Sequence, residues 1–564
     1  MLDIGFYLTA QKEICELAHF GMQLILHAIK FKMNHFNEQT KLGLRIRLLN
    51  ILLNADNTST WFLQGPSYLK NSLCLTLIEF LKREWPQNWP NFFNELFEIS
   101  ARSYDQKCLV FIVLKYIAEE FLDTDNINLP TQRRKDISQY LNANMEQVYT
   151  FLIDNLDYFY THLLKNPADN EVISLTDVCL DCFNCYINWL SFSYLFSRNF
   201  MLINVAFRFL THEKLSVNAA KCLITLINRK GTPDERKPLI GLFEESILSQ
   251  IMGCIKNSLE NAAFKDLTKY LIQILIGMGF HLSALWVKPE FERPAQFRNF
   301  LNTIFEITLS QNKFFSFDAM QLWNHFLANE LMQTDADVQV CLSNLAQAMT
   351  STFILFKNNT QTFKDEFESE EEYLKFFHKY RGELSKLIRA GAGLSLAPFL
   401  LSAYDWTMKV LNETQMLPES DQSGYDSGSM LYLSWDAVIY LWSNLTQVIS
   451  KKMKQKSFKD EHELSLIKEK TIAVLSACFQ SKFKNPNYCS YNLSLLSSIL
   501  SFSELFDSGI RSDMYKQILD KLFDDLTFFK NECVVEQQAN QQAWVILLKF
   551  FSLKVFIRVC LIFR

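Results

Sequence analysis

One pattern dominates the sequence: apolar residues recur at helical spacing along almost its whole length. In the first such stretch the apolar face consists of Leu17, Gly21, Leu24, Ala28 and Phe31. Intervals of three and four residues place these side chains on one side of an α-helix. The alternation that marks a β-strand is nowhere convincing. Glycine and proline are scarce, with 15 and 12 copies in 564 residues, which argues against a loop-rich or sandwich fold.

The same spacing predicts a long succession of helices joined by short polar turns. The predicted helices cover residues 42–53, 69–81, 105–122, 132–163, 172–196, 200–211, 215–229, 239–259, 264–281, 297–309, 315–331, 337–356, 371–390, 396–411, 430–450, 462–481, 490–506, 512–528 and 536–550. Amphipathic helices repeated over this length are typical of an α-solenoid. We therefore predict an all-α, right-handed α-solenoid of HEAT-type helical hairpin repeats. Because the units resemble one another only weakly, periodicity alone leaves other helical arrays open.

Charge and cysteine content limit the class of protein. The net charge is −5 and the isoelectric point is near 6.1, so the chain is not a globally basic nucleic-acid binder. Any contact with RNA must come from a local basic patch. Thirteen cysteines, an odd number without small-domain spacing, indicate reduced thiols inside the cell. The opening residues carry Asp3 where a secretory signal would carry cations, so we expect no such signal.

Two Trp-Pro pairs four residues apart interrupt the helical pattern within LKREWPQNWPNFF, residues 81–93. Proline cannot continue a helix, so Pro86 predicts that the preceding helix stops near Arg83. Pro90 fits the first turn of the next helix, where a missing N–H costs little. We expect Trp85 and Trp89 to pack over this helix corner and to have a structural role.

The same residues carry a family resemblance. Trp85, Pro86, Trp89, Pro90 and Phe92 resemble the turn that marks the exportin branch of the importin-β superfamily, where an N-terminal HEAT helix ends in this way. Residues 18–33 resemble the first part of the N-terminal domain of the same family. Three further blocks resemble the exportin-5-like group of that branch: residues 129–156, 228–243 and 367–389. The resemblance keeps its order over roughly residues 11–550.

The resemblance implies a RanGTP-dependent nuclear export receptor without catalytic activity, cofactor or membrane contact. Its implied partners are the small GTPase Ran in its GTP form, double-stranded structured RNA with a 3′ overhang, and nuclear pore proteins. The implied cargo is precursor microRNA, with tRNA as a further candidate, and the receptor would shuttle between nucleus and cytoplasm through the pore. Two alternatives stay open: a HEAT-repeat scaffold, and a karyopherin that carries protein cargo without binding RNA.

The resemblance also suggests a division of the chain. Residues 1–110 correspond to the importin-β N-terminal, Ran-binding repeats, 111–415 to exportin-type HEAT repeats and 430–550 to further HEAT repeats. The polar stretch 416–429 has no helical face and is predicted to be a mobile insertion. The tail 551–564 is atypical and suggests a truncated or misannotated gene model or a broken terminal helix. By the same comparison we expect part of the family's N-terminal segment and its C-terminal arch to be missing.

Other motifs weigh towards structural roles. Cys179, Cys182 and Cys185 have the spacing of part of a metal-binding run, but they lack a loop and a fourth ligand, so we expect buried apolar thiols. Gly391 and Gly393 lack the remaining features of a nucleotide-binding loop, and Gly391 is expected to end a helix. No enzyme motif is present.

Three basic groups are candidates for contact with RNA or another partner, although solvated surface is at least as plausible for each. They are Arg133 with Arg134, Arg236 with Lys237, and the cluster Lys451, Lys452 and Lys454. An acidic group, Glu368, Glu370, Glu371 and Glu372, is a candidate for contact with Ran. We favour a local role for these acids, because carboxylates stabilise the start of the helix that follows.

Overall fold

The computed structural model describes residues 1–11, 14–53, 65–122, 130–260, 265–310, 312–348, 367–417, 430–458, 460–483 and 485–499, with short pieces between 505 and 521. The described residues form helices and no β-strand, as the periodicity predicts. The predicted insertion beyond Leu417, the helix at 536–550 and the tail 551–564 lie outside them.

The chain divides into two compact units, residues 1–281 and 282–564. The helices that lie in the first unit are α1 (Leu2–Thr9), α2 (Cys15–Lys32), α3 (Glu38–Leu53), α5 (Ser67–Glu84), α6 (Phe92–Ser100), α7 (Tyr104–Ile117), α8 (Thr131–Lys165), α9 (Asn170–Ile187), α10 (Phe192–Leu195), α11 (Ser197–Phe209), α12 (Ser216–Asn228), α13 (Pro233–Arg236) and α14 (Glu245–Glu260). Short 3-10 or π segments are η1 (Met33–His35), η2 (Ala118–Leu122) and η3 (Lys237–Phe243). Helix α15 (Lys265–Leu285) begins in this unit and ends just beyond it.

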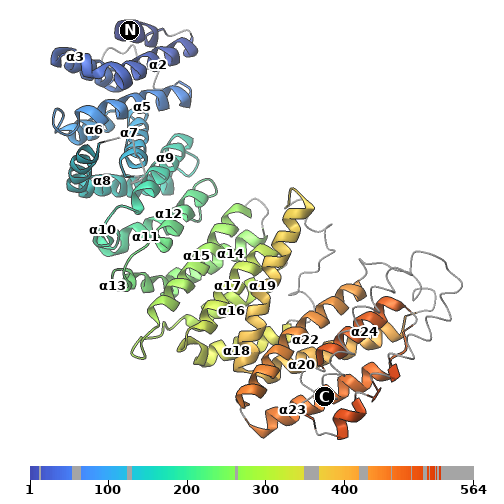
Figure 1. Ribbon diagram of the computed structural model, residues 1–564. Coiled ribbons are helices and arrows are strands. Elements are labelled where there is room, and N and C mark those ends of the chain that lie inside the picture. The colour runs from blue at the N-terminus through green and yellow to red at the C-terminus, as the bar shows by residue number, and fades with distance from the viewer. Residues whose placement is uncertain are drawn as a thin grey trace, which may run out of the picture. The chain divides into compact units, whose positions relative to one another are not determined.

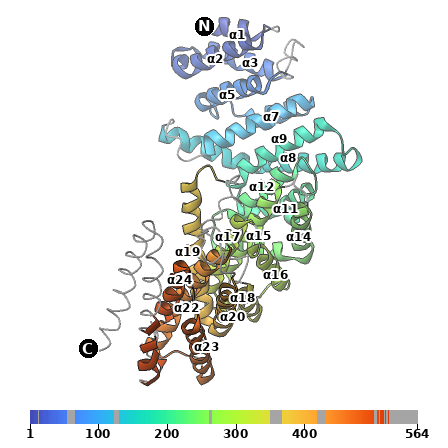
Figure 2. The ribbon, with the colours of Figure 1, turned by 90° about the vertical axis from the view of Figure 1, so that its right-hand side faces the viewer.

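The first unit is a stack of helical pairs in two layers. Helices α2, α5, α7, α9 and α12 each contact the next and form one layer. Helices α6, α8 and α11 pair with α7, α9 and α12 from the other side. Figure 1 and Figure 2 show these helices following one another in chain order. Each pair buries its apolar stripe between its two neighbours, which is the arrangement that defines a solenoid.

The second unit repeats this plan. Its helices are α16 (Phe297–Thr308), α17 (Lys313–Ala328), α18 (Ala336–Ala348), α19 (Glu370–Leu394), α20 (Leu396–Gln415), α22 (Met430–Gln455), α23 (Glu461–Gln480) and α24 (Pro486–Ile499), with the 3-10 segment η5 (Met332–Thr334). The series α16, α18, α20, α23 forms one layer and α17, α19, α22, α24 forms the other, each helix contacting the next in its series. Both units are thus built from stacked helical hairpins of the HEAT type.

Short polar side chains fix where many of these helices begin. Ser103, Asp169, Asn312, Ser369 and Asp460 each accept a hydrogen bond from a backbone N–H in the first turn of the following helix. These N–H groups have no partner inside the helix, so each cap contributes about 1 kcal/mol.

Buried tryptophans join the two layers of the second unit. The indole N–H of Trp323 in α17 donates to the Thr308 hydroxyl in α16 at 3.0 Å. Trp435 and Trp442 in α22 donate in the same way to Thr414 and Thr407 in α20, at 2.9 and 2.8 Å. Each threonine hydroxyl in turn donates to the carbonyl four residues earlier in its own helix. The indole N–H is therefore satisfied inside an apolar interface, which would otherwise penalise it.

The Trp-Pro corner is buried as the sequence predicts. Trp85 and Trp89 are 2% and 0% exposed. The ring of Trp89 lies between Phe80 and Phe92, at centroid distances of 6.0 and 5.0 Å. Its indole N–H donates to the Glu95 carboxylate at 3.1 Å. The corner therefore ties the end of α5 to the start of α6.

Arg45 of α3 covers this corner. Its guanidinium lies 4.5 Å from the centroid of the Trp89 ring and donates to the Glu95 carboxylate at 3.0 Å. The contact joins a cation–π interaction to a charge-assisted hydrogen bond. A third helix is thereby fixed to the corner.

Four details of the predicted helices are wrong. The predicted helix 239–259 is split, because residues 237–243 form the 3-10 segment η3, Glu244 is extended and α14 begins at Glu245. Pro90 precedes the first turn of α6, because Trp89 is still folded into a turn by a hydrogen bond to the Pro86 carbonyl, and α6 starts at Phe92. The predicted helix 172–196 is broken after Ile187, whose carbonyl accepts a hydrogen bond from Arg229 at 2.9 Å. Helix α19 continues past Gly391 to Leu394.

Gly391 serves packing instead of ending the helix. A β-carbon at this position would lie 2.5 Å from the Phe399 ring and 2.9 Å from a methyl group of Leu342. Glycine therefore allows α19 to approach α18 and α20 closely.

Among the described helices, none is both long and apolar enough to cross a membrane alone. One pair bent by 68°, Pro233–Phe243 with Glu245–Lys256, meets the length and composition criteria together.

The corner offers a test of what holds the first unit together. Trp89→Ala should lower the free energy of unfolding by about 3–5 kcal/mol, because a fully buried ring and its hydrogen bond are lost. Trp189→Ala is the matched control, since Trp189 is 37% exposed. This variant should lower the free energy of unfolding far less. Urea denaturation followed by circular dichroism, with hydrogen exchange of α5 and α6, measures both. Equal losses in the two variants would contradict the assigned role of the corner.

Candidate functional site

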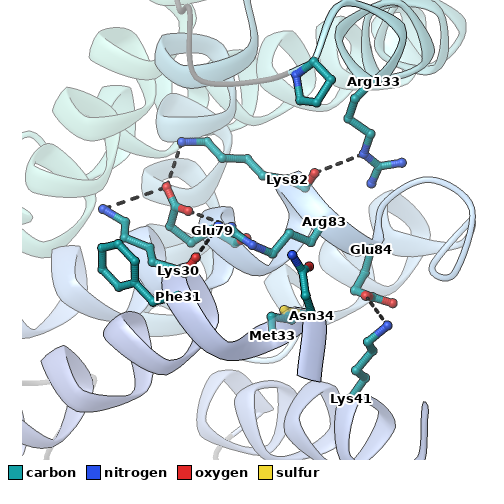
Figure 3. Close-up of a pocket in the computed structure, with 11 residues that line it drawn as sticks. Lys30, Phe31, Met33, Asn34, Lys41, Glu79, Lys82, Arg83, Glu84 and Arg133 are labelled. Atoms are coloured by element: carbon teal, nitrogen blue, oxygen red, sulfur yellow. Dashed lines mark hydrogen bonds and ion pairs between the residues drawn. The ribbon is translucent and has the colours of Figure 1, made fainter. Parts of the chain in front are cut away.

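A polar cavity of about 670 Å³ opens next to the Trp-Pro corner (Figure 3). It lies at the C-terminal ends of α2 and α5, facing Lys41 of α3 and the first turn of α8. Five cationic side chains and two carboxylates line it: Lys30, Lys41, Lys82, Arg83, Arg133, Glu79 and Glu84. We call it the basic cavity. It has more cationic side chains than the other cavity described below, which is lined by three.

Glu79 organises the inner wall of the basic cavity. Its carboxylate accepts hydrogen bonds from Lys82 at 2.9 Å and from Arg83 at 2.8 Å. Burial alone would raise the pKa of Glu79, but the hydrogen bonds from these two cations outweigh it, so the pKa is lowered. Lys82 is 8% exposed and also donates to Glu120 at 2.6 Å. The wall is therefore a preformed network of charges.

Arg83 and Arg133 close the ends of helices. Arg83 donates to the Lys30 carbonyl in the last turn of α2 at 3.1 Å. Arg133 donates to the Lys82 carbonyl at 3.0 Å, and also to the Trp85 carbonyl and the Gln87 amide oxygen. Carbonyls in a last helical turn have no partner within the helix. Both arginines therefore have a structural role besides lining the cavity.

The remaining charged groups of the basic cavity differ in how firmly they are held. Lys41 lies 2.9 Å from Glu38 and 3.5 Å from Glu84. Lys30 has a side chain 43% exposed, and its ammonium lies 4.0 Å from the Glu79 carboxylate. Lys30 is thus the most accessible and most loosely paired cation of the set.

A second cavity, of about 530 Å³, lies between α19 and α22 in the other unit. Arg389, Gln447, Lys451, Lys452 and Ser457 are among its lining residues. The Arg389 guanidinium donates to the Gln447 amide oxygen at 3.1 Å. We call it the α19–α22 cavity.

The lysine cluster predicted from the sequence separates into two kinds of residue. Lys452 is 7% exposed and pairs with Glu463 of α23 at 3.2 Å, inside the protein. Lys451 and Lys454 are exposed. Arg389, which the sequence did not single out, joins Lys451 in the α19–α22 cavity because α19 and α22 are neighbours in one layer.

The other predicted basic residues lie apart from these cavities, except Arg133. Arg134 is half-buried on α8, and Lys237 is exposed at the start of η3. Arg236 donates to the Ile227 carbonyl at 2.9 Å, and burial lowers its pKa. Arg236 therefore helps to close α12.

The acidic group begins α19, as the favoured interpretation predicts. Ser369 caps the helix, and Glu370, Glu371 and Glu372 occupy its first turn. The Glu372 carboxylate accepts the Glu368 N–H at 3.1 Å. All four residues are exposed, so their role at the start of the helix leaves them accessible to a partner protein.

The cysteine run is buried in α9 and does not form a metal site in the described part of the chain. Cys179 and Cys182 are fully buried, and burial raises the pKa of both thiols well above its ordinary value. Burial also raises the pKa of the half-buried Cys185 to about 11. These thiols are protonated at neutral pH and pack as small apolar groups.

Comparisons with known proteins decide the family. The profile of the Exportin-5 family matches residues 264–563, more than half of the chain. The chain belongs to the Exportin-5 family. A second profile, of Exportin 1-like proteins, matches residues 66–223, which include the Trp-Pro corner. The family resemblance read from the sequence is thereby confirmed.

The relatives are distant but extend along the chain. Human Exportin-5 is 24% identical over 563 residues, covering 95% of this chain and 45% of the human protein. Exportin-5 of Dictyostelium discoideum is 24% identical over 417 residues, covering 68% of this chain and 34% of that protein. The chain thus spans about half the length of the human relative.

A solved structure supports the fold. The structure titled "Importin13 cytosolic state" superposes with a TM-score of 0.55 at 13% identity, over 92% of this chain and 60% of that one. The prediction of a HEAT-type helical solenoid is confirmed.

The neighbouring residues Lys451 and Lys452 provide a test of the buried Lys452–Glu463 ion pair beside the α19–α22 cavity. Lys452→Ala should lower the free energy of unfolding of the second unit by about 3 kcal/mol, because the buried Glu463 carboxylate loses its ammonium partner. Lys451→Ala, one residue away and exposed, should change it by less than about 0.5 kcal/mol. Thermal unfolding of both variants measures the difference. If Lys452→Ala leaves the free energy of unfolding unchanged, the Lys452–Glu463 ion pair adds nothing to stability.

Proposed function

We propose that this chain acts in a RanGTP-dependent nuclear export receptor whose cargo is double-stranded, structured RNA with a 3′ overhang. Family membership carries the proposal, together with the similarity to human Exportin-5 along 95% of the chain. Precursor microRNA is the proposed main cargo and tRNA a further one. In this proposal the receptor works without a cofactor, passes the nuclear pore by contact with its proteins, and shuttles between nucleus and cytoplasm.

We assign RanGTP to the N-terminal repeats, residues 1–110. The support is an exposed apolar strip on α2, where Leu17, Phe20 and Phe31 are 37%, 54% and 69% exposed. Exposed apolar side chains grouped on one helix are typical of protein interfaces. The acids Glu368, Glu370, Glu371 and Glu372 are a second proposed Ran contact, through their exposed carboxylates.

We assign RNA phosphates to the α19–α22 cavity. Arg389 and Lys451 line it, and Lys454 follows one turn along α22. A net charge of −5 requires such a local concentration of accessible cations. Arg133, Arg134 and Arg236 are weaker candidates because they are partly buried, whereas Lys237 is exposed and stays a candidate.

Release of cargo follows from linkage between the two ligands. If RanGTP and RNA favour the same curvature of the stacked helices, each raises the affinity of the other by the same factor. Hydrolysis of GTP on Ran then removes one contribution, and the affinity for RNA falls. The receptor needs no catalytic group for this cycle.

Binding of the purified chain to Ran loaded with GTP or with GDP tests the proposal first. We expect at least tenfold tighter binding of the GTP form, and an RNA hairpin with a 3′ overhang should strengthen it further. Equal binding of both forms by a folded chain would instead favour a HEAT-repeat scaffold. Selectivity for RanGTP without any response to RNA would favour a karyopherin for protein cargo.

Charge reversal tests the RNA surface separately. Lys451→Glu with Lys454→Glu should weaken RNA hairpin binding about tenfold or more and reduce its salt dependence, because two phosphate contacts are lost. Lys409→Glu on α20, in the opposite layer, is the control, because Lys409 is also exposed. Filter binding at several salt concentrations measures all three proteins. If the control variant loses as much RNA affinity, the effect comes from the overall charge of the chain and not from this surface.

A further inference from the structure

We propose that the basic cavity binds a compact anion that carries several phosphate groups. This site is separate from the RNA surface assigned above and does not rest on the proposed export function. The inference follows from the charge, the enclosure and the spacing of the side chains that line the cavity.

The charge balance of the cavity favours an anion. Five cations face two carboxylates across a space of about 670 Å³, within the range of small-molecule sites. Glu79 and Glu84 partly neutralise these cations, and two further carboxylates contact them from outside the lining, Glu38 at Lys41 and Glu120 at Lys82. Five cations against these four carboxylates leave a small excess of positive charge.

The start of α8 adds to the same field. Its N-cap is Pro130, which lines the cavity and supplies no capping side chain, and the first turn of this 35-residue helix contains no acid. The N-terminal end of a helix attracts anions through its free N–H groups and its dipole. This end reinforces the cations, although it would not by itself define a site.

The positions of the cations favour several phosphates over one. Figure 3 shows Lys30 on one side of the cavity, Lys41 and Arg133 on the other, and Arg83 between them. Lys30, Lys82 and Arg83 converge on Glu79, whereas Lys41 pairs with Glu84 and Arg133 lies in the first turn of α8. A ligand with several phosphates can contact cations at all three of these places together. Hydrogen bonds from arginine and lysine to phosphate oxygens are charge-assisted and therefore stronger than hydrogen bonds between neutral groups.

Enclosure favours a small ligand over a nucleic-acid backbone. Three of the lining cations are largely shielded from solvent: Lys82 is 8% exposed, and the side chains of Arg83 and Lys41 are 29% and 20% exposed. Their other contacts hold them in place before a ligand arrives, which lowers the entropic cost of binding. Phe31, 69% exposed at the rim, offers an apolar edge beside the charges.

Calorimetric titration of the full chain tests the proposal with three probes. Inositol hexakisphosphate carries clustered phosphates, ATP carries a linear triphosphate with a base, and inorganic phosphate carries one group. We expect the first or second probe to bind at least about tenfold more tightly than inorganic phosphate. Preference for ATP would identify a nucleotide site using Phe31, and preference for the inositol phosphate a site for a cyclic polyphosphate.

A variant locates the site. Lys30→Glu should weaken binding of the preferred probe about tenfold, because it inverts the charge of the most accessible cation. Lys32→Glu, exposed on the same helix end but outside the cavity, should change it less than about twofold. Circular dichroism confirms that both variants fold, and Lys30→Gln replaces the first if it does not.

Three results would overturn the proposal: no binding of any probe, equal binding of all three, or equal losses in the Lys30 and Lys32 variants. Protection of the first turn of α8 and the end of α5 from hydrogen exchange by the bound probe provides an independent check. If the probe protects other segments only, the basic cavity is not its site.

Discussion

The stacking of helical pairs is the constraint on which both units depend. A helix such as α5 buries side chains on nearly all sides, including Leu73, Leu77 and Phe80, and one partner helix cannot cover them all. It therefore packs between α2 and α7, and each of these needs a further neighbour in turn. The large number of buried aromatic and aliphatic residues follows from this geometry, because every internal layer has two faces to fill.

Polar groups at the helix ends decide how the layers connect. Arg133 accompanies the end of α5, Arg83 the end of α2, Arg236 the end of α12 and Arg229 the end of α9. Each guanidinium supplies donors to carbonyls that the helix leaves without partners. Arginines predicted from the sequence to bind a partner, such as Arg133 and Arg236, thus also bind the carbonyls at helix ends. The cations that are accessible to a partner form a smaller and different set.

Periodicity predicted the helices because helix formation is local. It predicted the buried face less well: in α2 the predicted apolar face includes Leu17 and Phe31, which are exposed, while Ala18, Met22 and Ile25 are buried. Local signals also predicted the packing of Trp85 and Trp89 at the corner and the position of the acids 368–372 at a helix start. The cavities were not predictable, since Arg389 meets Lys451, and Lys30 meets Arg133, only through stacking of helices far apart in sequence. The doublet Lys82-Arg83 before the Trp-Pro turn was the one available sequence signal for the basic cavity, because it places two cations at the end of a helix where the chain turns.

The two cavities share a design. The basic cavity lies where α2 and α5 end, and the α19–α22 cavity lies where α19 and α22 end. In each, one lysine is buried in ion pairs that hold a helix end: Lys82 with Glu79 and Glu120, and Lys452 with Glu463 of the next helix. Cations at the C-terminal end of a helix complement its dipole and are favoured there for stability. The last turns of α2, α5 and α22 carry such cations. The preference of helix ends for cations therefore places positive charge at these cavities, even in a chain whose net charge is negative.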